Sequence, residues 1–383
     1  MTPARLPTGA AVAVIGGGVT GLSTAWWLAR EGVDVTVLEA GIIGGEASGR
    51  NGGGCSHHYS PLFAEEQRLW PEMDEELGYP TEFQPNRVRI ALSEEQFEYY
   101  GRAKTNAERQ GFRCDVLDQK QVRELVPLAS ENFGGYHFHF GGHANPQRTV
   151  QGYAWAVQDR GGSVMQQTRV TGFSVEHGRV RSLTTNRGTV GCDFVVIAAG
   201  PATGVLVRQI GTDIPLVPSR AEMLVTEPLP LMPIGGVDGN GLYGRQSLRG
   251  NLIYGGGPHE WISDDPSGGR LHSSTPLVRN IAGRVAELLP KAAHAHVIRS
   301  WAGVVENTPD GRPVIERLIS PDNVVVATMS GVGFGLSPAV GHVIRDLVVD
   351  GGCSFADIST YALSRFDQLE PDWAQRQGWR QSA

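Results

Sequence analysis

Residues 10–39, AAVAVIGGGVTGLSTAWWLAREGVDVTVLE, decide the fold of this chain. A short apolar run leads into Gly16-x-Gly18-x-x-Gly21, an amphipathic helix follows, and a second apolar run ends at Glu39. This order predicts a βαβ unit that binds a dinucleotide. Gly16 allows the tight turn, Gly18 lets the backbone approach a pyrophosphate, and Gly21 allows the helix to pack closely on the strand. The carboxylate of Glu39 is placed to accept hydrogen bonds from the adenosine ribose hydroxyls.

The composition excludes several classes of protein. The chain has 383 residues, 40% of them hydrophobic, which is enough for two lobes with a substantial core. Its formal net charge is −7 and no basic stripe occurs, which argues against a nucleic-acid partner. No apolar run approaches the roughly 18 residues of a membrane helix, so we expect no membrane span and a cytoplasmic protein. The four cysteines form no CxxC pair, which indicates neither a disulfide framework nor a zinc site.

Elements of nucleotide-binding character occur at both ends of the chain and in its middle, and two β-rich stretches separate them. We therefore expect an α/β fold in which a Rossmann-type cofactor-binding domain is interleaved with a β-sheet-rich substrate-binding domain. The cofactor-binding domain is predicted from residues 1–90, 147–215 and 305–383. The substrate-binding domain is predicted from residues 91–146 and 216–304.

Local patterns predict individual elements along the chain. Ser93 with Gln96 three residues later predicts the capped start of a helix that runs to residue 111. The other expected elements are an acidic helical segment at 62–77, an extended segment at 134–146, helices at 147–160, 274–289 and 337–350, and a strand at 163–170.

Further short motifs follow the N-terminal unit. They are Ala198-Ala199-Gly200, the WAG of residues 301–303, Pro309-Asp310-Gly311-x-Pro313, and Gly331-x-Gly333-x-Gly335 before the last helix. In their order and spacing the chain resembles the D-amino acid oxidase superfamily of FAD-dependent oxidoreductases over nearly its whole length. SGRNGGG at 48–54, YGRQ at 243–246 and ENTPDG after the WAG are most similar to sarcosine oxidase β-subunits and to hydroxyproline and opine dehydrogenase subunits.

The resemblance implies that the dinucleotide is FAD rather than NAD. The ADP half favours neither, but a second glycine-lined helix N-terminus suits the pyrimidine ring of a flavin, where N–H groups stabilise the negative charge of the reduced ring. By analogy with the family, the backbone of Val170 contacts the adenine, and Ser48, Arg50 and Asn51 lie along the pyrophosphate and ribityl chain. The residues predicted to bind FAD are Gly16, Gly18, Val19, Thr20, Gly21, Glu39, Ala40, Ser48, Arg50, Asn51, Gly52, Gly53, Val170, Ala199, Gly200, Gly331, Val332, Gly333, Phe334 and Gly335.

The resemblance also implies the chemistry. In this superfamily a hydride passes from the amine-bearing carbon of the substrate to flavin N5, and the imine product hydrolyses. The expected substrate is a small secondary amine, imino acid or amino acid, and the electron acceptor is O2, a redox partner or another subunit. The strand lysine that speeds the reaction with oxygen in monomeric sarcosine oxidases is missing from residues 251–254, which slightly favours a dehydrogenase.

Recognition of the substrate carboxylate is where the chain departs from part of the family. Glycine oxidase and D-amino acid oxidase carry an arginine two residues after the WAG or WGG glycine, and Val305 occupies that position here. The remaining candidates are Arg220, Arg245 and Arg299. Arg245, with Tyr243 and Gln246, is favoured for a bidentate pair with the carboxylate, and a solvated strand residue is the open alternative. Glu306 points to a substrate with a second, cationic group.

Two groups of histidines remain. His57 and His58 follow the glycine-rich segment and are expected at the reactive edge of the flavin, where a histidine can attach covalently in this superfamily; a plain loop position is the alternative. His137, His139 and His143 are spaced along an extended segment in a way that could mimic a metal site. No acidic or thiol partner accompanies them in the sequence, so we expect no metal site.

Three other functions remain open at this point. A glycine or D-amino acid oxidase acts on primary amines, and Val305 argues against it. An FAD-binding subunit of a multi-subunit dehydrogenase would hold FAD and resist reduction by every amine. An NAD-dependent dehydrogenase would release its cofactor and show no yellow colour.

Overall fold

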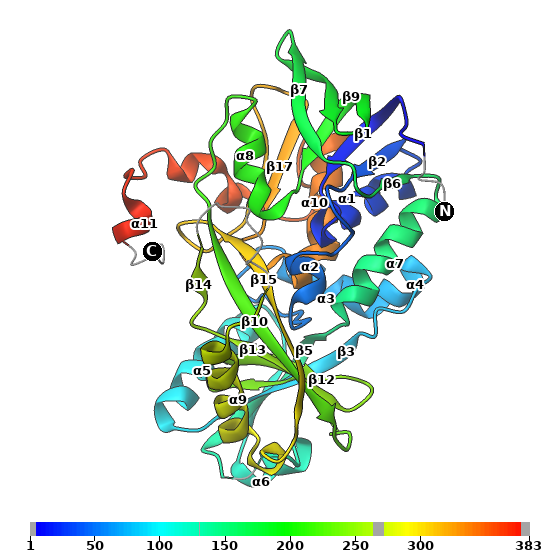
Figure 1. Cartoon of the computed structure of the whole chain (residues 1–383). Coiled ribbons are helices and arrows are strands. Elements are labelled where there is room, and N and C mark those ends of the chain that lie inside the picture. The colour runs from blue at the N-terminus through cyan, green and yellow to red at the C-terminus, as the bar shows by residue number, and fades with distance from the viewer. Residues whose placement is uncertain (1–4, 130, 263–271, 377–383) are drawn as a thin grey trace.

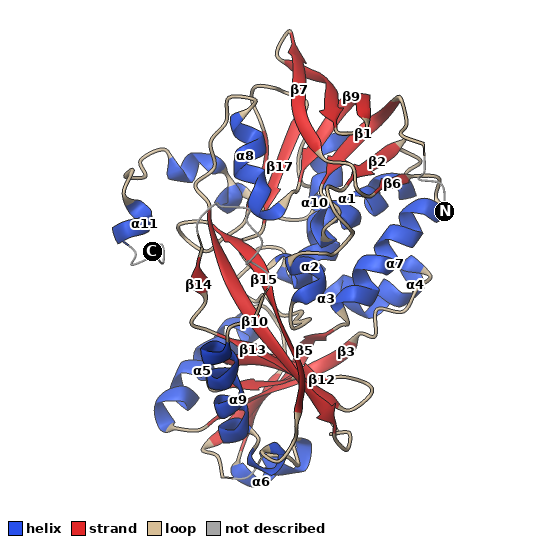
Figure 2. Cartoon of the chain, in the orientation of Figure 1, coloured by secondary structure: helices blue, strands red, loops and turns tan. Residues whose placement is uncertain are grey.

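The strands of the chain form two sheets, one in each lobe of the molecule (Figures 1 and 2). This computed structural model describes residues 5–129, 131–262 and 272–376. The upper lobe in both figures holds the sheet that contains the N-terminal βαβ unit, and the lower lobe holds the other sheet. The chain crosses between the lobes several times, so neither lobe is a continuous segment. This agrees with the α/β fold expected from the sequence.

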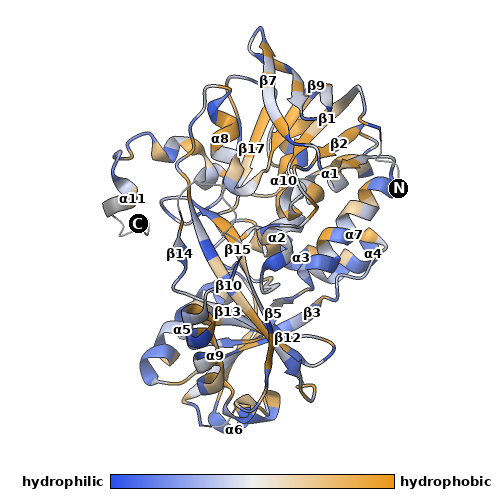
Figure 3. Ribbon diagram, viewed as in Figure 1, coloured by the Kyte–Doolittle hydropathy of each residue, from blue (hydrophilic) through white to orange (hydrophobic). Residues whose placement is uncertain are grey.

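The first sheet is built around the N-terminal unit. Its strands are β1 (Gly9–Ile15), β2 (Val35–Leu38), β6 (Ser163–Met165), β7 (Val170–Glu176), β8 (Arg179–Thr185), β9 (Gly188–Ile197), β16 (Val314–Arg317) and β17 (Val324–Thr328). The order is β16-β17-β9-β1-β2-β6, with β8 paired to β9 and β7 to β8. β1 runs parallel to β2 and β9, with Val14 opposite Val37 and Val196. The inner strands are apolar (Figure 3) because both faces of the sheet are covered.

Helices cover the two faces of the first sheet. α1 (Val19–Arg30), α7 (Pro146–Asp159) and α10 (Gly333–Val349) pack together on one face, and α8 (Thr203–Arg208) packs on the other. Trp27 Nε1 in α1 donates to the carbonyl of Pro338 in α10 at 2.8 Å. α1 follows β1 and α10 follows β17, and these strands point the same way, so both helix N-termini lie at one edge of the sheet.

The second sheet is mostly antiparallel. Its strands are β3 (Gln84–Ala91), β4 (Cys114–Leu117), β5 (Gly134–His143), β10 (Val217–Pro228), β11 (Val237–Gly239), β12 (Leu242–Gln246), β13 (Asn251–Gly256), β14 (Glu260–Trp261) and β15 (Val297–Asn307). The order is β14-β10-β13-β12-β11-β3-β5-β4, and β15 pairs with β10. These two long strands reach from the second sheet towards the first (Figure 1).

The two faces of the second sheet differ. α6 (Gln119–Leu125) and α9 (Thr275–Leu288) cover an apolar face. The opposite face carries Arg87, Met223, Tyr243 and Arg245, as the strand registers show, and we call it the site face. α5 (Glu94–Arg109) packs on the outer part of the site face, beside Tyr136 and its aromatic neighbours.

Short helices connect the two lobes. They are α2 (Ala47–Arg50), α3 (Phe63–Leu69) and α4 (Met73–Leu77), and α11 (Trp373–Arg376) lies near the C-terminus. Figure 1 shows α2 and α3 between the two sheets. None of the helices in the described part of the chain has the length and apolar composition that a membrane span requires.

The acidic helical segment predicted at 62–77 is confirmed: α3, a 3-10 turn at Trp70–Glu72 and α4 follow one another without a gap. The predicted elements differ from the observed ones at two places. The segment 163–170 is not one strand, because Gln167 has a φ of +56° and breaks it before β7. The last helix begins at Gly333 instead of residue 337. The cap on the helix at 93 is confirmed, with Gln96 N donating to Ser93 Oγ at 3.3 Å.

The strands of the second sheet extend slightly beyond the predicted domain boundaries. β3 begins at Gln84, before the predicted boundary at 90, and β15 ends at Asn307, after the boundary at 305. The division into a cofactor-binding and a substrate-binding domain depends on where the ligands bind, and it stays a prediction.

Candidate active site

Glycines close the turn between β1 and α1. Gly16 has a φ of +116°, and a Cβ there would lie 2.3 Å from the carbonyl oxygen of Ala198. A Cβ on Gly21 would lie 2.1 Å from the carbonyl oxygen of Gly16. Neither position has room for a larger residue, in agreement with the roles predicted for both glycines in the turn.

The N-terminus of α1 faces Ser48. Val19 N donates to Ser48 Oγ at 2.9 Å, and a Cβ on Gly18 would lie 3.0 Å from the same oxygen. Val19, Thr20 and Gly21 form the first turn of the helix, where N–H groups have no acceptor within the helix. This helix end can therefore hold a phosphate.

Glu39 turns its carboxylate back towards the glycine turn. Oε2 accepts a hydrogen bond from Gly17 N at 2.7 Å, and Oε1 accepts one from Gly41 N at 2.6 Å. Its main-chain oxygen accepts from Thr168 N at 2.7 Å. Ala40 continues the same edge of the sheet. The carboxylate is thus fixed where the ribose of a dinucleotide is predicted.

Arg50 fastens the segment after β2 to the strand that carries the WAG motif. Its Nε donates to Gly45 O at 2.6 Å and its Nη1 to Ala302 O at 3.2 Å. Trp301 Nε1 donates to the carbonyl of Arg50 at 2.8 Å. The guanidinium therefore positions the segment through backbone acceptors, and a direct contact of Arg50 with FAD stays a prediction.

Asn51 shapes the glycines that follow it. Its Nδ2 donates to Ser48 O at 2.9 Å, and its Oδ1 accepts from Gly53 N at 2.7 Å. A Cβ on Gly52 would lie 3.3 Å from the ring of Tyr243, so this segment lies directly against the site face.

The N-terminus of α10 is lined by glycines. A Cβ on Gly335 would lie 2.3 Å from Cε1 of His57, and the carbonyl of Gly335 accepts from Trp70 Nε1 at 2.6 Å. The side chain of Phe334 points into the core, 5.6 Å from the Trp70 ring. The backbone of Phe334, not its side chain, is therefore the part available to a ligand.

The residues before α10 face the WAG strand. A Cβ on Gly331 would lie 3.4 Å from Cγ1 of Val305, while Val332 and Gly333 form the start of the helix. Val305 therefore stands at the α10 end of the site and offers only methyl groups there.

These features fit FAD. Two glycine-lined helix ends open at one edge of the first sheet, and the carboxylate of Glu39 lies at that edge. The end of α1 suits the pyrophosphate, and the end of α10 suits the pyrimidine ring of the flavin. When bound, FAD supplies the acceptor for the electrons of the substrate.

His57 is oriented by a buried carboxylate. The ring nitrogen Nδ1 of His57 lies 2.7 Å from Glu66 Oε1, and the backbone N–H of His57 donates to Glu66 Oε2 at 2.9 Å. The side chain of Glu66 is fully buried. Since one ring nitrogen is occupied, Nε2 is the nitrogen that can meet a ligand.

His58 packs among aromatic rings. Its ring centroid lies 3.9 Å from that of Tyr59 and 6.4 Å from that of Phe63. Burial, followed by the charges of Arg89 and Arg87, lowers the pKa of His58 to about 4. The ring is therefore neutral near pH 7, and its predicted role in the reaction stays a prediction.

Tyr243 and Arg245 lie on the site face as neighbours two residues apart. The hydroxyl of Tyr243 lies 3.4 Å from His259 Nε2, and burial raises the pKa of Tyr243 to about 12. Arg245 is only 5% exposed and donates to the carbonyl of Gly52. It borders a polar cavity of about 400 Å³ that Arg148 also lines. Arg245 is thus not a solvated strand residue, and its contact with a carboxylate stays a prediction.

Glu306 faces the first sheet. Its Oε1 accepts from Met329 N at 2.9 Å and from Thr328 Oγ1 at 3.3 Å, and its Oε2 lies 3.8 Å from where a Cβ of Gly200 would be. Burial raises the pKa of Glu306. The carboxylate therefore has partners after β17, and pairing with a cationic substrate stays a prediction.

Two predicted contacts of the cofactor flank these elements. Ala199 follows β9, and its N–H donates to Thr203 Oγ1 at 3.1 Å. Val170 is buried at the start of β7, not at the end of a strand as expected, because the chain turns after β6.

Three charged residues on the site face were not singled out in the sequence. Arg87 and Arg89 of β3 both pair with Asp238 of β11. The pattern Arg-Val-Arg puts two charges on one face of a strand whose other face is apolar, and that pattern was the available signal. Their partner comes from a distant segment, which the sequence alone does not reveal.

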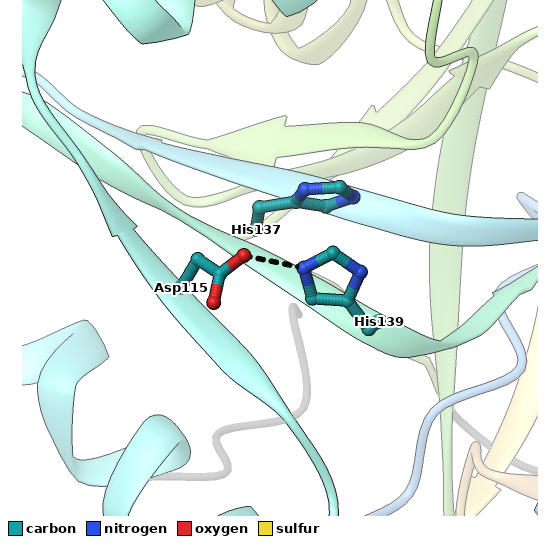
Figure 4. Close-up of side chains that lie close together, drawn as sticks. All are labelled: Asp115, His137 and His139. Carbon is teal, nitrogen blue, oxygen red and sulfur yellow. Dashed lines mark hydrogen bonds and ion pairs between the residues drawn. The ribbon is translucent and has the colours of Figure 1, made fainter.

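The histidines of β5 have an acidic neighbour after all. Asp115 of β4 lies opposite His137, and its Oδ2 lies 2.7 Å from His139 Nε2 (Figure 4). The sequence argument that no acidic partner accompanies these histidines is therefore wrong, because strand pairing supplies one. Arg113 also donates to the Asp115 carboxylate, at 2.7 Å and 3.1 Å, which places a positive charge beside the cluster.

Comparisons with known proteins identify the family of the chain. A family model described as DAO, FAD dependent oxidoreductase, matches residues 11–347. The beta subunit of sarcosine oxidase from Rhizobium meliloti (strain 1021) is 28% identical over 375 residues, covering 94% of this chain and 88% of that protein. The B subunit of opine oxidase from Rhizobium meliloti is 27% identical over 391 residues, covering 94% and 98%.

Solved structures share the fold. L-proline dehydrogenase from P. horikoshii has a TM-score of 0.86 at 25% identity, covering 95% of this chain and all of that one. Glycine oxidase from Geobacillus kaustophilus has a TM-score of 0.85 at 24% identity, covering 94% and 99%. Because the family model spans most of the chain, the protein belongs to the DAO family of FAD-dependent oxidoreductases.

Proposed function

We propose that the protein oxidises a small secondary amine or imino acid that carries a carboxylate. Sarcosine, opines and proline, which appear in the names of three similar proteins, are all secondary amines with a carboxylate. Bound FAD would supply the acceptor for the hydride of the amine-bearing carbon, and water would hydrolyse the imine product. The single observation that carries the proposal is Val305, whose methyl groups stand at the α10 end of the site.

The residues of the chain serve this reaction by binding and positioning. The first-turn N–H groups of α10 stabilise negative charge on the pyrimidine side of the cofactor. Glu66 holds His57 against that helix end, and Tyr243 covers the segment at Gly52. No side-chain base is required when the amine binds in its neutral form, because the cofactor carries the hard step.

A glycine or D-amino acid oxidase acting on primary amines is the second candidate. The fold that this chain shares with glycine oxidase is compatible with this candidate. Those enzymes carry an arginine at the position of Val305, and its replacement by a valine here distinguishes this chain from them.

We further propose that the chain works with other subunits. Two of the similar proteins, those of sarcosine oxidase and opine oxidase, are named as subunits. A partner subunit or O2 then receives the electrons. A cytoplasmic location, expected from the sequence, stays a prediction.

The test is anaerobic reduction of the bound flavin, followed by its visible absorbance. Sarcosine, proline and an opine are compared with glycine and with D- and L-alanine. Bleaching by secondary amines alone supports the proposal. Bleaching by primary amino acids at equal or lower concentration refutes it in favour of the second candidate. A flavin that no amine bleaches indicates a subunit whose role is assembly.

A further inference from the structure

Arg87 and Arg89 of β3 share one carboxylate. Arg89 donates from Nε to Asp238 Oδ1 at 2.8 Å and from Nη2 to Oδ2 at 3.3 Å. Arg87 donates through Nη2 to the same Oδ2. Asp238 is 9% exposed, so two guanidinium groups are gathered around one nearly buried anion. A guanidinium that is nearly buried and has only a share of one carboxylate is energetically unfavourable.

Arg87 is the arginine with donors to spare. Arg89 uses two nitrogens of its fork on Asp238, whereas Arg87 uses one. The Nε of Arg87 is buried and has no partner among the described residues. The side chain is nevertheless 13% exposed, so a small ligand can reach its outer edge.

Charges on neighbouring elements do not cancel the excess positive charge of the two arginines over Asp238. Glu66 of α3 lies close enough to favour the charged form of Arg87, but both its oxygens already accept hydrogen bonds from His57. Arg245 of β12 adds another positive charge to the same face. Glu82 lies close enough to Arg245 to favour its charged form, so the surplus of one positive charge belongs to Arg87 and Arg89 beside the single carboxylate of Asp238.

Arg87 also lies towards the predicted centre of the reaction. The hairpin of β11 and β12 places Asp238 opposite Tyr243 on the site face. Glu66, the other anion near Arg87, holds His57 at the N-terminus of α10. Arg87 therefore shares the site face with Tyr243 and lies near the carboxylate that orients His57.

We propose that Arg87 binds the carboxylate of the substrate, and that Asp238 and Arg89 hold it in position. The inference rests on the proposed function only in taking the ligand to be an amino or imino acid. A guanidinium suits a carboxylate because it offers parallel donors. Arg245 is less suited, since it already donates to the carbonyl of Gly52.

The test uses methoxyacetate, in which an ether oxygen replaces the amine of sarcosine, so that it binds without being oxidised. It is titrated into the FAD-loaded protein, and the visible spectrum of the flavin reports binding. We expect Arg87→Met to bind it about 30-fold more weakly or worse, as when one partner of a buried charge pair is lost. With the amine that bleaches the flavin, KM rises by a similar factor and kcat changes less.

Matched variants decide the result. Arg113→Met removes an arginine that is 71% exposed and leaves binding unchanged. Arg87→Lys keeps the charge beside Asp238 but loses the fork, so it is the variant to use if Arg87→Met fails to fold; we expect it to bind several-fold more weakly than the wild type. Unchanged binding in Arg87→Lys and Arg87→Met, or a large loss only in Arg245→Met, overturns the inference.

The two proposals fail in distinguishable ways. Binding of methoxyacetate that depends on Arg87, in a protein whose flavin no secondary amine bleaches, refutes the proposed function and supports the carboxylate site. Bleaching by secondary amines with KM values that do not depend on Arg87 supports the function and refutes the site.

Discussion

His143, at the end of β5, is kept neutral by its surroundings. It is 3% exposed, and burial followed by the charge of Arg245 lowers its pKa to about 3. In the unfolded chain the pKa of a histidine is about 6.5. Between these pH values the unfolded chain binds a proton on this residue and the folded chain does not. The free energy of unfolding therefore falls as the pH drops from about 6.5 towards 3.

Replacement of His143 removes this dependence. We expect His143→Asn to lose roughly 2 kcal/mol less of its free energy of unfolding than the wild type between pH 7 and pH 4.5. Urea unfolding at both pH values measures the difference. His177→Asn changes an exposed histidine and serves as the control. Equal losses in His143→Asn and the wild type would show that His143 is protonated in the folded protein.

The roles of single residues were predictable where all the residues involved lie close together in the sequence. Gly16, Gly21 and Glu39 belong to one short motif, and the structure places them at one turn. The arginine pair on the site face was not predictable in the same way. Arg89 and Asp238 are 149 residues apart, and only the pairing of β3 with β11 brings them together.

The start of α10 shows how a glycine can be misread at the scale of an element. The sequence predicts a loop up to residue 336, because glycine is unfavourable inside helices. The structure begins the helix at Gly333. Residue 335 is a glycine inside the helix because His57 packs where a Cβ would be. The glycine serves a close approach between elements and not a turn.

A substitution at Gly335 tests this reading. The new Cβ would lie 2.3 Å from His57 Cε1 and 2.6 Å from the carbonyl oxygen of Gly54. We expect Gly335→Ala to lower the free energy of unfolding by about 1–3 kcal/mol, as overpacking does, and to weaken FAD binding. Urea unfolding of the FAD-loaded protein measures the first effect, and equilibrium dialysis of FAD the second.

The control is a glycine with open space around it. Gly283 lies in α9, is exposed, and no heavy atom lies within 4 Å of a Cβ placed there. Gly283→Ala is expected to raise the free energy of unfolding by up to about 1 kcal/mol. If both substitutions stabilise the protein, the close approach at α10 is not a constraint.

At the scale of the whole molecule, the α/β architecture was predictable and the exact division was not. Repeated apolar strands and glycine turns indicate interleaved parts, and the chain does cross between the lobes repeatedly. The boundaries were less readable because β10 and β15 extend from the second sheet towards the first, and no change of composition marks where such a long strand begins or ends.

Because the site lies between the lobes, contacts that join them should control the cofactor. Trp301 of β15 donates from Nε1 to the carbonyl of Arg50 at 2.8 Å, which fastens the segment predicted to line FAD to the second sheet. Trp301→Phe keeps an aromatic ring but loses this hydrogen bond. The segment is then stabilised by about 1 kcal/mol less, which corresponds to roughly fivefold weaker FAD binding. FAD titration of the apoprotein measures the change. Trp155→Phe alters a tryptophan of α7 that is 45% exposed and should leave the affinity as it is. Wild-type affinity in Trp301→Phe would mean that the segment keeps its shape without the second sheet.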